Sequence, residues 1–266
     1  MARMHEVDFQ VHGDDLQFVE VELDPGEAAV AEAGAFMYME DGIEMETVFG
    51  DGSKQKSGLF DSLLGAGRRL LTGESLFTTV FLNRAGGKRK VAFGAPHPGK
   101  IIPVDLGQMG GELIAQKDSF LAAAKGVTLG IAMQKKLGTG LFGGEGFIMQ
   151  RLQGDGLVFI HAGGTLHERM LGPGELLRVD TGCIVAFQPT VDFDIQRVSG
   201  IKTAFFGGEG FFFATVRGPG RVWLQSLPFN RLASRVLAAA RPGSSSEEGS
   251  VLGNLGLGNL GLSDDP

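Results

Sequence analysis

The stretch Gly143–Phe147, with the sequence GGEGF, decides the fold because it recurs as Gly207–Phe211. A degraded third copy lies at Thr72–Phe77, and basic residues precede all three copies. A glycine-containing hairpin follows each copy. It begins nine residues after the glutamate in the two GGEGF copies and twelve residues after it in the degraded copy. This repetition predicts a chain built from three copies of one unit, of which the first is the divergent copy.

Alternating apolar residues predict that each unit is made of strands. The alternation has a period of two at Ile43–Thr47, Val127–Ile131 and Val191–Ile195, as is typical of half-buried strands. A Gly-Glu turn opens each unit, and the glycine hairpin precedes a final strand. Glycine supplies the positive φ that such tight turns require. The sequence therefore predicts an all-β fold with three pseudo-repeats.

We expect a single all-β domain over residues 1–241, with repeats at about 5–96, 97–160 and 161–227. Pro228 precedes a segment in which Leu232, Val236 and Leu237 share one face, which predicts an amphipathic helix at about 229–240. Residues 242–266 change to a Gly-, Ser-, Leu- and Asn-rich composition, which predicts a low-complexity, disordered tail. The alternative is a tail that docks through its leucines.

The composition excludes several classes of protein. A net charge of −7 over 266 residues argues against binding to polyanions. The single cysteine, Cys183, excludes an intrachain disulfide and a cysteine-based zinc site. No apolar run approaches the roughly 18 residues of a membrane span. The N-terminus carries early acids and no apolar signal core, so we expect a cytoplasmic protein.

Three stretches resemble the altered-inheritance-of-mitochondria protein 24 family, a domain of unknown function. They are Leu71–Phe77, Leu141–Phe147 and Gln225–Phe229, and the resemblance covers about residues 4–240. It implies three short double-stranded β-helix modules, of β-sandwich type, around a pseudo-threefold axis. Each module would be similar to the tryptophan-RNA-binding attenuation protein (TRAP-like). Bacterial members have no settled activity. The fungal relative is tied to mitochondrial inner-membrane organisation, and this N-terminus lacks a mitochondrial presequence.

A threefold arrangement would place the glutamate of each motif, and its upstream cation, at equivalent positions. The candidate charge ring comprises Glu74, Glu145, Glu209, Arg69, Lys136 and Lys202. In one interpretation each glutamate caps backbone amides at its glycine turn or pairs with a neighbouring cation. In the other, the ring binds a small anion or cation. The residues alone leave both open.

The first unit carries an insertion, residues 51–67. Its apolar side chains are a candidate surface for a protein partner or for self-association: Leu59, Phe60, Leu63 and Leu64. The alternative is that they cover one end of the core of that unit.

No catalytic constellation is found in the sequence. Gly138–Gly143 matches G-x-G-x-x-G, but the residues after it, Phe147–Leu152, read as a strand and not as the helix of a dinucleotide site. His161, His167 and Glu168 form a candidate metal site, although a cupin-type site would want a close His-x-His pair with further ligands. We therefore expect no cofactor and no metal.

The sequence predicts a non-enzymatic binding or assembly protein of unknown specific role. Fold analogy leaves two alternatives, a nucleic-acid or small-anion binding protein and a metal-dependent enzyme on a cupin-like scaffold. We do not expect nucleic acid as a partner, because the chain is acidic and the basic run Arg84–Lys90 is interpreted as a solvated hairpin. An interaction scaffold predicts an exposed apolar patch and a defined oligomer.

Overall fold

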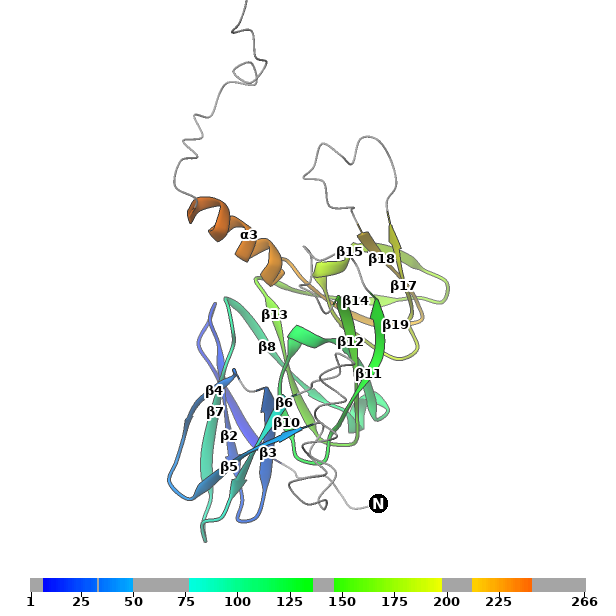
Figure 1. Cartoon of the computed structure of the whole chain (residues 1–266). Helices are drawn as coiled ribbons and strands as arrows, with labels where there is room; N and C mark the ends of the chain where they lie inside the picture. Colours follow the sequence, from blue (N-terminus) through cyan, green and yellow to red (C-terminus); the bar gives the residue numbers. More distant parts are fainter. Residues whose placement is uncertain (1–6, 33, 50–76, 136–145, 198–211, 241–266) are drawn as a thin grey trace, which may run out of the picture. The chain divides into compact units, whose positions relative to one another are not determined.

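The computed structural model describes residues 7–32, 34–49, 77–135, 146–197 and 212–240, which are predominantly strands (Figure 1). The chain divides into two compact units, Met1–Leu232 and Ala233–Pro266. All described strands belong to the first unit, and one α-helix, α3 (Phe229–Ala240), begins in it. The predicted all-β fold and C-terminal helix are confirmed.

The strands fall into three consecutive segments. The first segment contains β1 (Asp8–His12), β2 (Phe18–Leu23), β3 (Ala28–Glu32), β4 (Phe36–Met39), β5 (Ile43–Phe49), β6 (Phe77–Asn83) and β7 (Arg89–Gly94). The second contains β8 (Gly99–Asp105), β9 (Glu112–Gln116), β10 (Phe120–Ala124), β11 (Thr128–Lys135), β12 (Phe147–Gln153) and β13 (Leu157–Gly163), with 3-10 turns η1 (Gly107–Met109) and η2 (Lys117–Ser119). The third contains β14 (Leu166–Leu171), β15 (Leu176–Asp180), η4 (Thr181–Cys183), β16 (Ile184–Phe187), β17 (Asp192–Arg197), β18 (Phe212–Arg217) and β19 (Gly220–Gln225).

Strands pair in the same order within each segment. The first segment has the orders β2-β7-β4 and β3-β6-β5, the second β8-β13-β10 and β9-β12-β11, and the third β14-β19-β16 and β15-β18-β17. A register shift also occurs at the same place, between the first and third residues of β4, β10 and β16. A β-bulge bends its strand and increases the local twist, so the same bend is built into all three segments.

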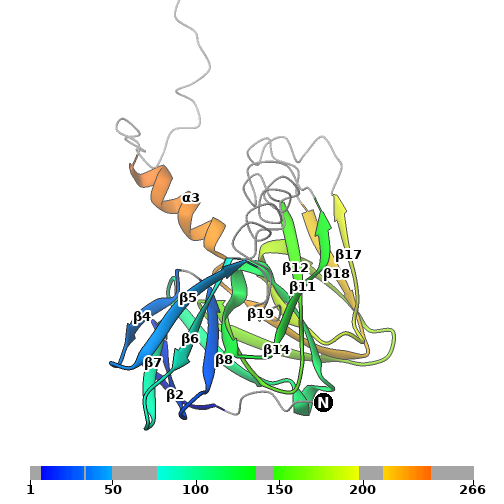
Figure 2. The ribbon, with the colours of Figure 1, turned by 60° about the horizontal axis from the view of Figure 1, so that its bottom comes forward.

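Two junctions join the segments into larger sheets. Pairing of β3 with β10 makes the six-stranded sheet β5-β6-β3-β10-β13-β8, and pairing of β9 with β16 makes the sheet β11-β12-β9-β16-β19-β14. The sheets β1-β2-β7-β4 and β15-β18-β17 remain separate. Figures 1 and 2 show β4 and β18 on opposite sides of the second segment. A closed threefold arrangement would need a third junction, between β15 and β4, so the predicted pseudo-threefold axis is not confirmed.

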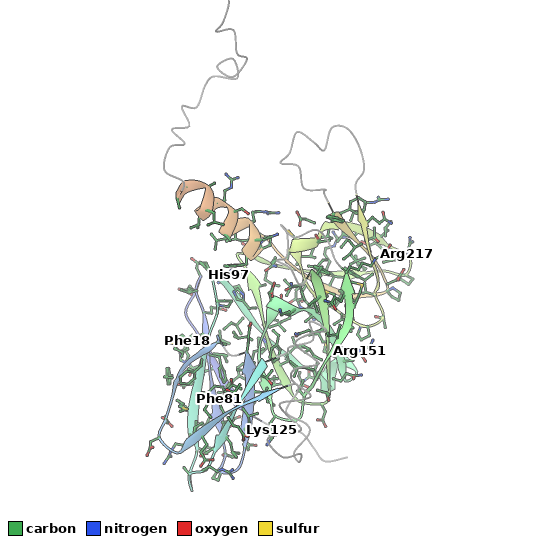
Figure 3. The ribbon with its side chains drawn as sticks, in the orientation of Figure 1. Phe18, Phe81, His97, Lys125, Arg151 and Arg217 are labelled. Atoms are coloured by element: carbon green, nitrogen blue, oxygen red, sulfur yellow. The ribbon has the colours of Figure 1, made fainter. Side chains whose placement is uncertain are left out.

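Three hydrophobic cores lie between successive sheets. The first includes Phe81, Phe93 and Phe159, between the four-stranded sheet and the first six-stranded sheet (Figure 3). The second includes Trp223, between the two six-stranded sheets, and the third includes Phe147, against the three-stranded sheet. Alternate residues of one strand enter different cores because successive side chains point to opposite faces.

The predicted strands are found at the predicted places. The alternating stretches form β5, β11 and β17, and the strands after the glycine hairpins are β7, β13 and β19. Strand β13 continues to Gly163, three residues past the predicted repeat boundary at 160. It does so because His161–Gly163 extend the ladder with Gly99–Ile101 of β8.

Candidate functional site

Strand β4 is a sheet edge with exposed apolar side chains. Among the described strands β7 alone pairs with it, and Phe36, Met37, Tyr38 and Met39 are 40%, 54%, 36% and 37% exposed. The corresponding strands β10 and β16 are paired on both sides, and all their residues are buried. Natural sheets avoid unpaired apolar edges because such edges recruit further strands. Strand β4 is therefore a candidate interaction surface.

Contacts within the first segment hold β4 in place. The Tyr38 hydroxyl donates to the Glu20 carboxylate on β2, and this hydrogen bond raises the pKa of Tyr38 to about 12. Lys90 Nζ donates to Glu20 Oε1 at 2.6 Å, and this bond, followed by the one from Tyr38, lowers the pKa of Glu20. The Phe36 ring stacks on Phe81 with centroids 5.4 Å apart. The edge is thus preformed and does not depend on a partner for its position.

Strand β15 also ends its sheet, because β18 is its single partner among the described strands. Other strands end sheets too, but β4 and β15 do so although their counterparts in the other segments are interior, and these two are called the free edges below. Leu177 and Val179 pack against the third core, while Leu176, Arg178 and Asp180 are exposed. Arg178 forms no ion pair with another described residue. The corresponding strands β3 and β9 are paired on both sides and mostly buried. An apolar residue and an unpaired cation therefore face solvent on β15.

A buried histidine pair lies at the end of β13. His161 is 2% exposed and its ring centroid lies 4.6 Å from that of His97. Burial, and then the nearby charge of His97, lowers the pKa of His161 to about 4; burial also lowers the pKa of His97. His97 in turn stacks on Phe229, the first residue of α3, with centroids 5.5 Å apart (Figure 3). Both imidazoles are therefore neutral packing elements at neutral pH.

The predicted metal ligands are not brought together. His167 and Glu168 are exposed on β14, and Glu168 Oε2 lies 3.6 Å from Arg221 Nη1. His161 is instead buried beside His97. Within the described part of the chain, no group of three or more His, Cys, Asp or Glu side chains is placed to hold a metal ion.

Carboxylates engage three of the four cations of the basic hairpin, while Arg89 donates to the backbone carbonyls of Asp41 and Lys88. Lys88 Nζ lies 2.7 Å from Glu22 Oε1, and Arg84 Nε lies 3.0 Å from Glu44 Oε2. Lys90 is bound to Glu20, as described above. The three acids lie on β2 and β5. The run is therefore a mixed-charge surface, not a basic strip for a phosphate backbone.

The half-buried Cys183 is not an activated thiol. Burial, and then the charge of Asp180, raises its pKa, while Arg231 opposes the shift. The thiolate is the reactive form of cysteine, so this environment suppresses nucleophilic behaviour.

Two predicted sites lie outside the described residues. The first is the charge ring of Glu74, Glu145, Glu209, Arg69, Lys136 and Lys202. The second is the apolar surface of Leu59, Phe60, Leu63 and Leu64. In the sequence, Glu74 lies between β5 and β6, Glu145 between β11 and β12, and Glu209 between β17 and β18. These are equivalent places in the three segments. Both sites remain predictions.

Sequence reasoning missed the two free edges, although a signal was present. Residues 36–39 read as an ordinary apolar strand, yet they place Tyr38 where β10 and β16 have Ala122 and Ala186. Likewise β15 has Arg178 where β9 has the buried Ile114. A bulky or charged residue at a position that is small or apolar in the other copies indicates a different environment.

Comparison with known proteins places the chain in a family. Among the described residues, no helix has the length and apolarity to cross a membrane. The uncharacterized protein M6_Spy0233 of Streptococcus pyogenes serotype M6 is 30% identical over 218 residues, or 81% of this chain and 83% of that protein. The crystal structure of protein SPYM3_0169 from Streptococcus pyogenes matches with a TM-score of 0.69 at 23% identity, covering 88% of this chain and 100% of that one, and shows a shared fold. Residues 9–227 match the family described as Mitochondrial biogenesis AIM24, so the chain belongs to the AIM24 family.

Proposed function

We propose that this chain is a non-enzymatic assembly protein built from three copies of one two-sheet module, each segment being one module. Two features support the three copies: the common strand order and the β-bulge at the same place in β4, β10 and β16. The junctions β3–β10 and β9–β16 are then one contact used twice. The strands β4 and β15 are the equivalents of the strands that form these junctions, so the same pairing is open to them with another molecule. A TRAP-like ring around a threefold axis and a cytoplasmic location remain predictions.

The observation that carries the proposal is the exposure of β4. Its four consecutive residues are all large, apolar and exposed. The other described strands with exposed large apolar residues carry one each, namely Phe9 on β1, Met45 on β5, Met170 on β14 and Leu176 on β15. Single exposed apolar residues are ordinary, whereas a contiguous group marks a binding surface.

The carboxylate partners of Arg84, Lys88 and Lys90 in the basic hairpin count against the nucleic-acid alternative. The family comparison supplies no activity, because the streptococcal relative is itself described as uncharacterized. The role that we propose is therefore binding through a sheet edge, in which backbone hydrogen bonds supply affinity and side chains supply selectivity.

Photo-crosslinking in the native cell tests the proposal. A photoreactive amino acid replaces Met37 in one strain and Leu16, which is 58% exposed outside the strands, in a control strain. We expect covalent adducts of higher mass from position 37 and only background from position 16. If position 37 yields no adduct above that background, β4 is not a binding edge and the proposal is wrong.

A further inference from the structure

The two sheets that contain the free edges β4 and β15 correspond to the two halves of a six-stranded sheet. Each six-stranded sheet joins three strands of one module to three strands of the next, with β3 or β9 meeting β10 or β16 in the middle. Applied once more, the same order would read β17-β18-β15-β4-β7-β2. The observed sheets β17-β18-β15 and β4-β7-β2-β1 are these two halves, separated between β15 and β4.

The existing junctions predict the register of the missing pair. Ala122 faces Ala31, and Ala186 faces Ala115. Ala122 and Ala186 are the third residues of β10 and β16, and their partners are the fourth residues of β3 and β9.

The corresponding residues of the free edges are Tyr38 and Val179. An antiparallel pair with Tyr38 opposite Val179 places Met39 opposite Arg178. Glu40 N donates to Lys90 O of β7 at 2.9 Å. Because successive amides of a strand alternate in direction, the Met39 amide points away from β7 and is available for this pairing.

The side chains at this register are complementary. Arg178, which has no ion-pair partner among the described residues, would lie opposite Met39 and diagonal to the exposed Asp41. Diagonal neighbours of opposite charge on adjacent strands attract. The thioether of Met39 can cover the aliphatic stem of Arg178, which keeps its charged end in water.

The chain does not bring its own two edges together. One junction leads from the first module to the second, and the same junction leads from the second to the third. If three such steps closed a ring, β15 would already pair with β4 of its own chain. The strand orders of the described residues contain no such pair, and Figures 1 and 2 show β4 and β18 on opposite sides of the second module. A further step therefore leads to another copy.

We infer that β15 of one copy pairs with β4 of a second copy, so that this chain assembles head to tail. The inference rests on the proposed function and names the partner as the chain itself. The contact is heterologous, because different surfaces of the two copies meet. Such a contact repeats until the copies close into a ring or continue as a filament.

Disulfide trapping tests the pairing and its register. One chain carries Met39→Cys and a second, differently tagged chain carries Arg178→Cys, both with Cys183→Ala to remove the native thiol. Directly opposite residues of an antiparallel pair lie within reach of a disulfide. We expect mild oxidation of the mixture to give a covalent dimer with both tags. A Leu16→Cys chain mixed with the Arg178→Cys chain is the control and should give background only.

A chain that carries both Met39→Cys and Arg178→Cys tests closure within one copy. An intramolecular disulfide in dilute protein, together with no dimer from the mixed chains, would overturn the inference. The proposed function is judged separately, since adducts of position 37 with a different protein would uphold it while removing self-assembly.

Charge exchange gives a second readout that does not depend on oxidation. Met39→Lys places like charges opposite each other and should weaken self-association about fivefold in sedimentation equilibrium. Adding Arg178→Glu should restore the association, whereas Leu16→Lys should leave it unchanged. A loss in Met39→Lys that Arg178→Glu fails to restore would contradict the register.

Discussion

Acidification should destabilise the fold through the buried His161. Its pKa is about 4 in the folded chain, against an ordinary value near 6.5, because burial disfavours the charged imidazole. Below about pH 6.5 the unfolded chain gains a proton that the folded chain does not bind. The free energy of unfolding therefore falls between about pH 6.5 and pH 4, and is unaffected by this group above that window.

The difference between the two pKa values sets the size of the effect. One pKa unit corresponds to about 1.4 kcal/mol, so His161 should remove about 3 kcal/mol of stability by pH 4. A domain of ordinary stability has about 5–15 kcal/mol in total. The ring that faces His161 is that of His97, which stacks on Phe229. Burial lowers the pKa of His97 too, against the opposing charge of Asp118, so His97 adds to the loss in the same direction.

Urea unfolding at pH 7, 6, 5 and 4 measures this effect. The fluorescence of Trp223, the single tryptophan, reports on the second core because its side chain is 2% exposed. His161→Gln is expected to lose about 3 kcal/mol less than the unmodified chain between pH 7 and pH 4. His167→Gln, at an exposed position on β14, is the matched control and should follow the unmodified chain. Equal pH dependence in all three proteins would refute the reasoning.

Three further predictions concern packing, hydrogen bonding and the β4 edge. In Gly163→Ala, the new Cβ would meet Leu227 O at 2.1 Å and His97 Cε1 at 2.5 Å, so urea unfolding should show a loss of about 1–3 kcal/mol. Gly130→Ala, which enters open space within a strand, should instead gain about 0.5 kcal/mol, and equal effects would contradict the close approach. Asn83 is fully buried, and its Nδ2 donates to Leu23 O at 2.8 Å and to Gly87 O at 2.9 Å. Asn83→Leu should therefore lower the free energy of unfolding in urea by about 2–4 kcal/mol. An unchanged free energy would show that these carbonyls find other donors. Tyr38 is the single tyrosine, so an ultraviolet titration of the protein should have its midpoint near pH 12. Glu20→Gln should lower this midpoint toward about 10. An unchanged midpoint would rule out the hydrogen bond to Glu20 as the cause of the raised pKa.

Strand positions were predictable because their causes are local. The alternation at Ile43–Thr47 and at Val127–Ile131 reflects which face of a strand is buried, and glycine turns end strands wherever they stand in the fold. The helix Phe229–Ala240 was predictable for the same reason, from one apolar face after a proline. The repeated GGEGF stretch predicted copies of one unit, and the strands pair in the same order in all three segments.

The sequence by itself determined the strands, the turns, the helix and the family of this protein. Only the tertiary structure decided that Phe36–Met39 is an edge while Phe120–Ala124 is an interior strand, since both stretches are apolar. It also decided that His161 is buried beside His97 and not near His167. The physical reason is that an edge is defined by a neighbour that is missing. Whether a neighbour is present depends on how whole segments join, through contacts far apart in the sequence. One segment read alone does not record it; the difference shows only when the segments are compared, as at Tyr38 against Ala122 and Ala186.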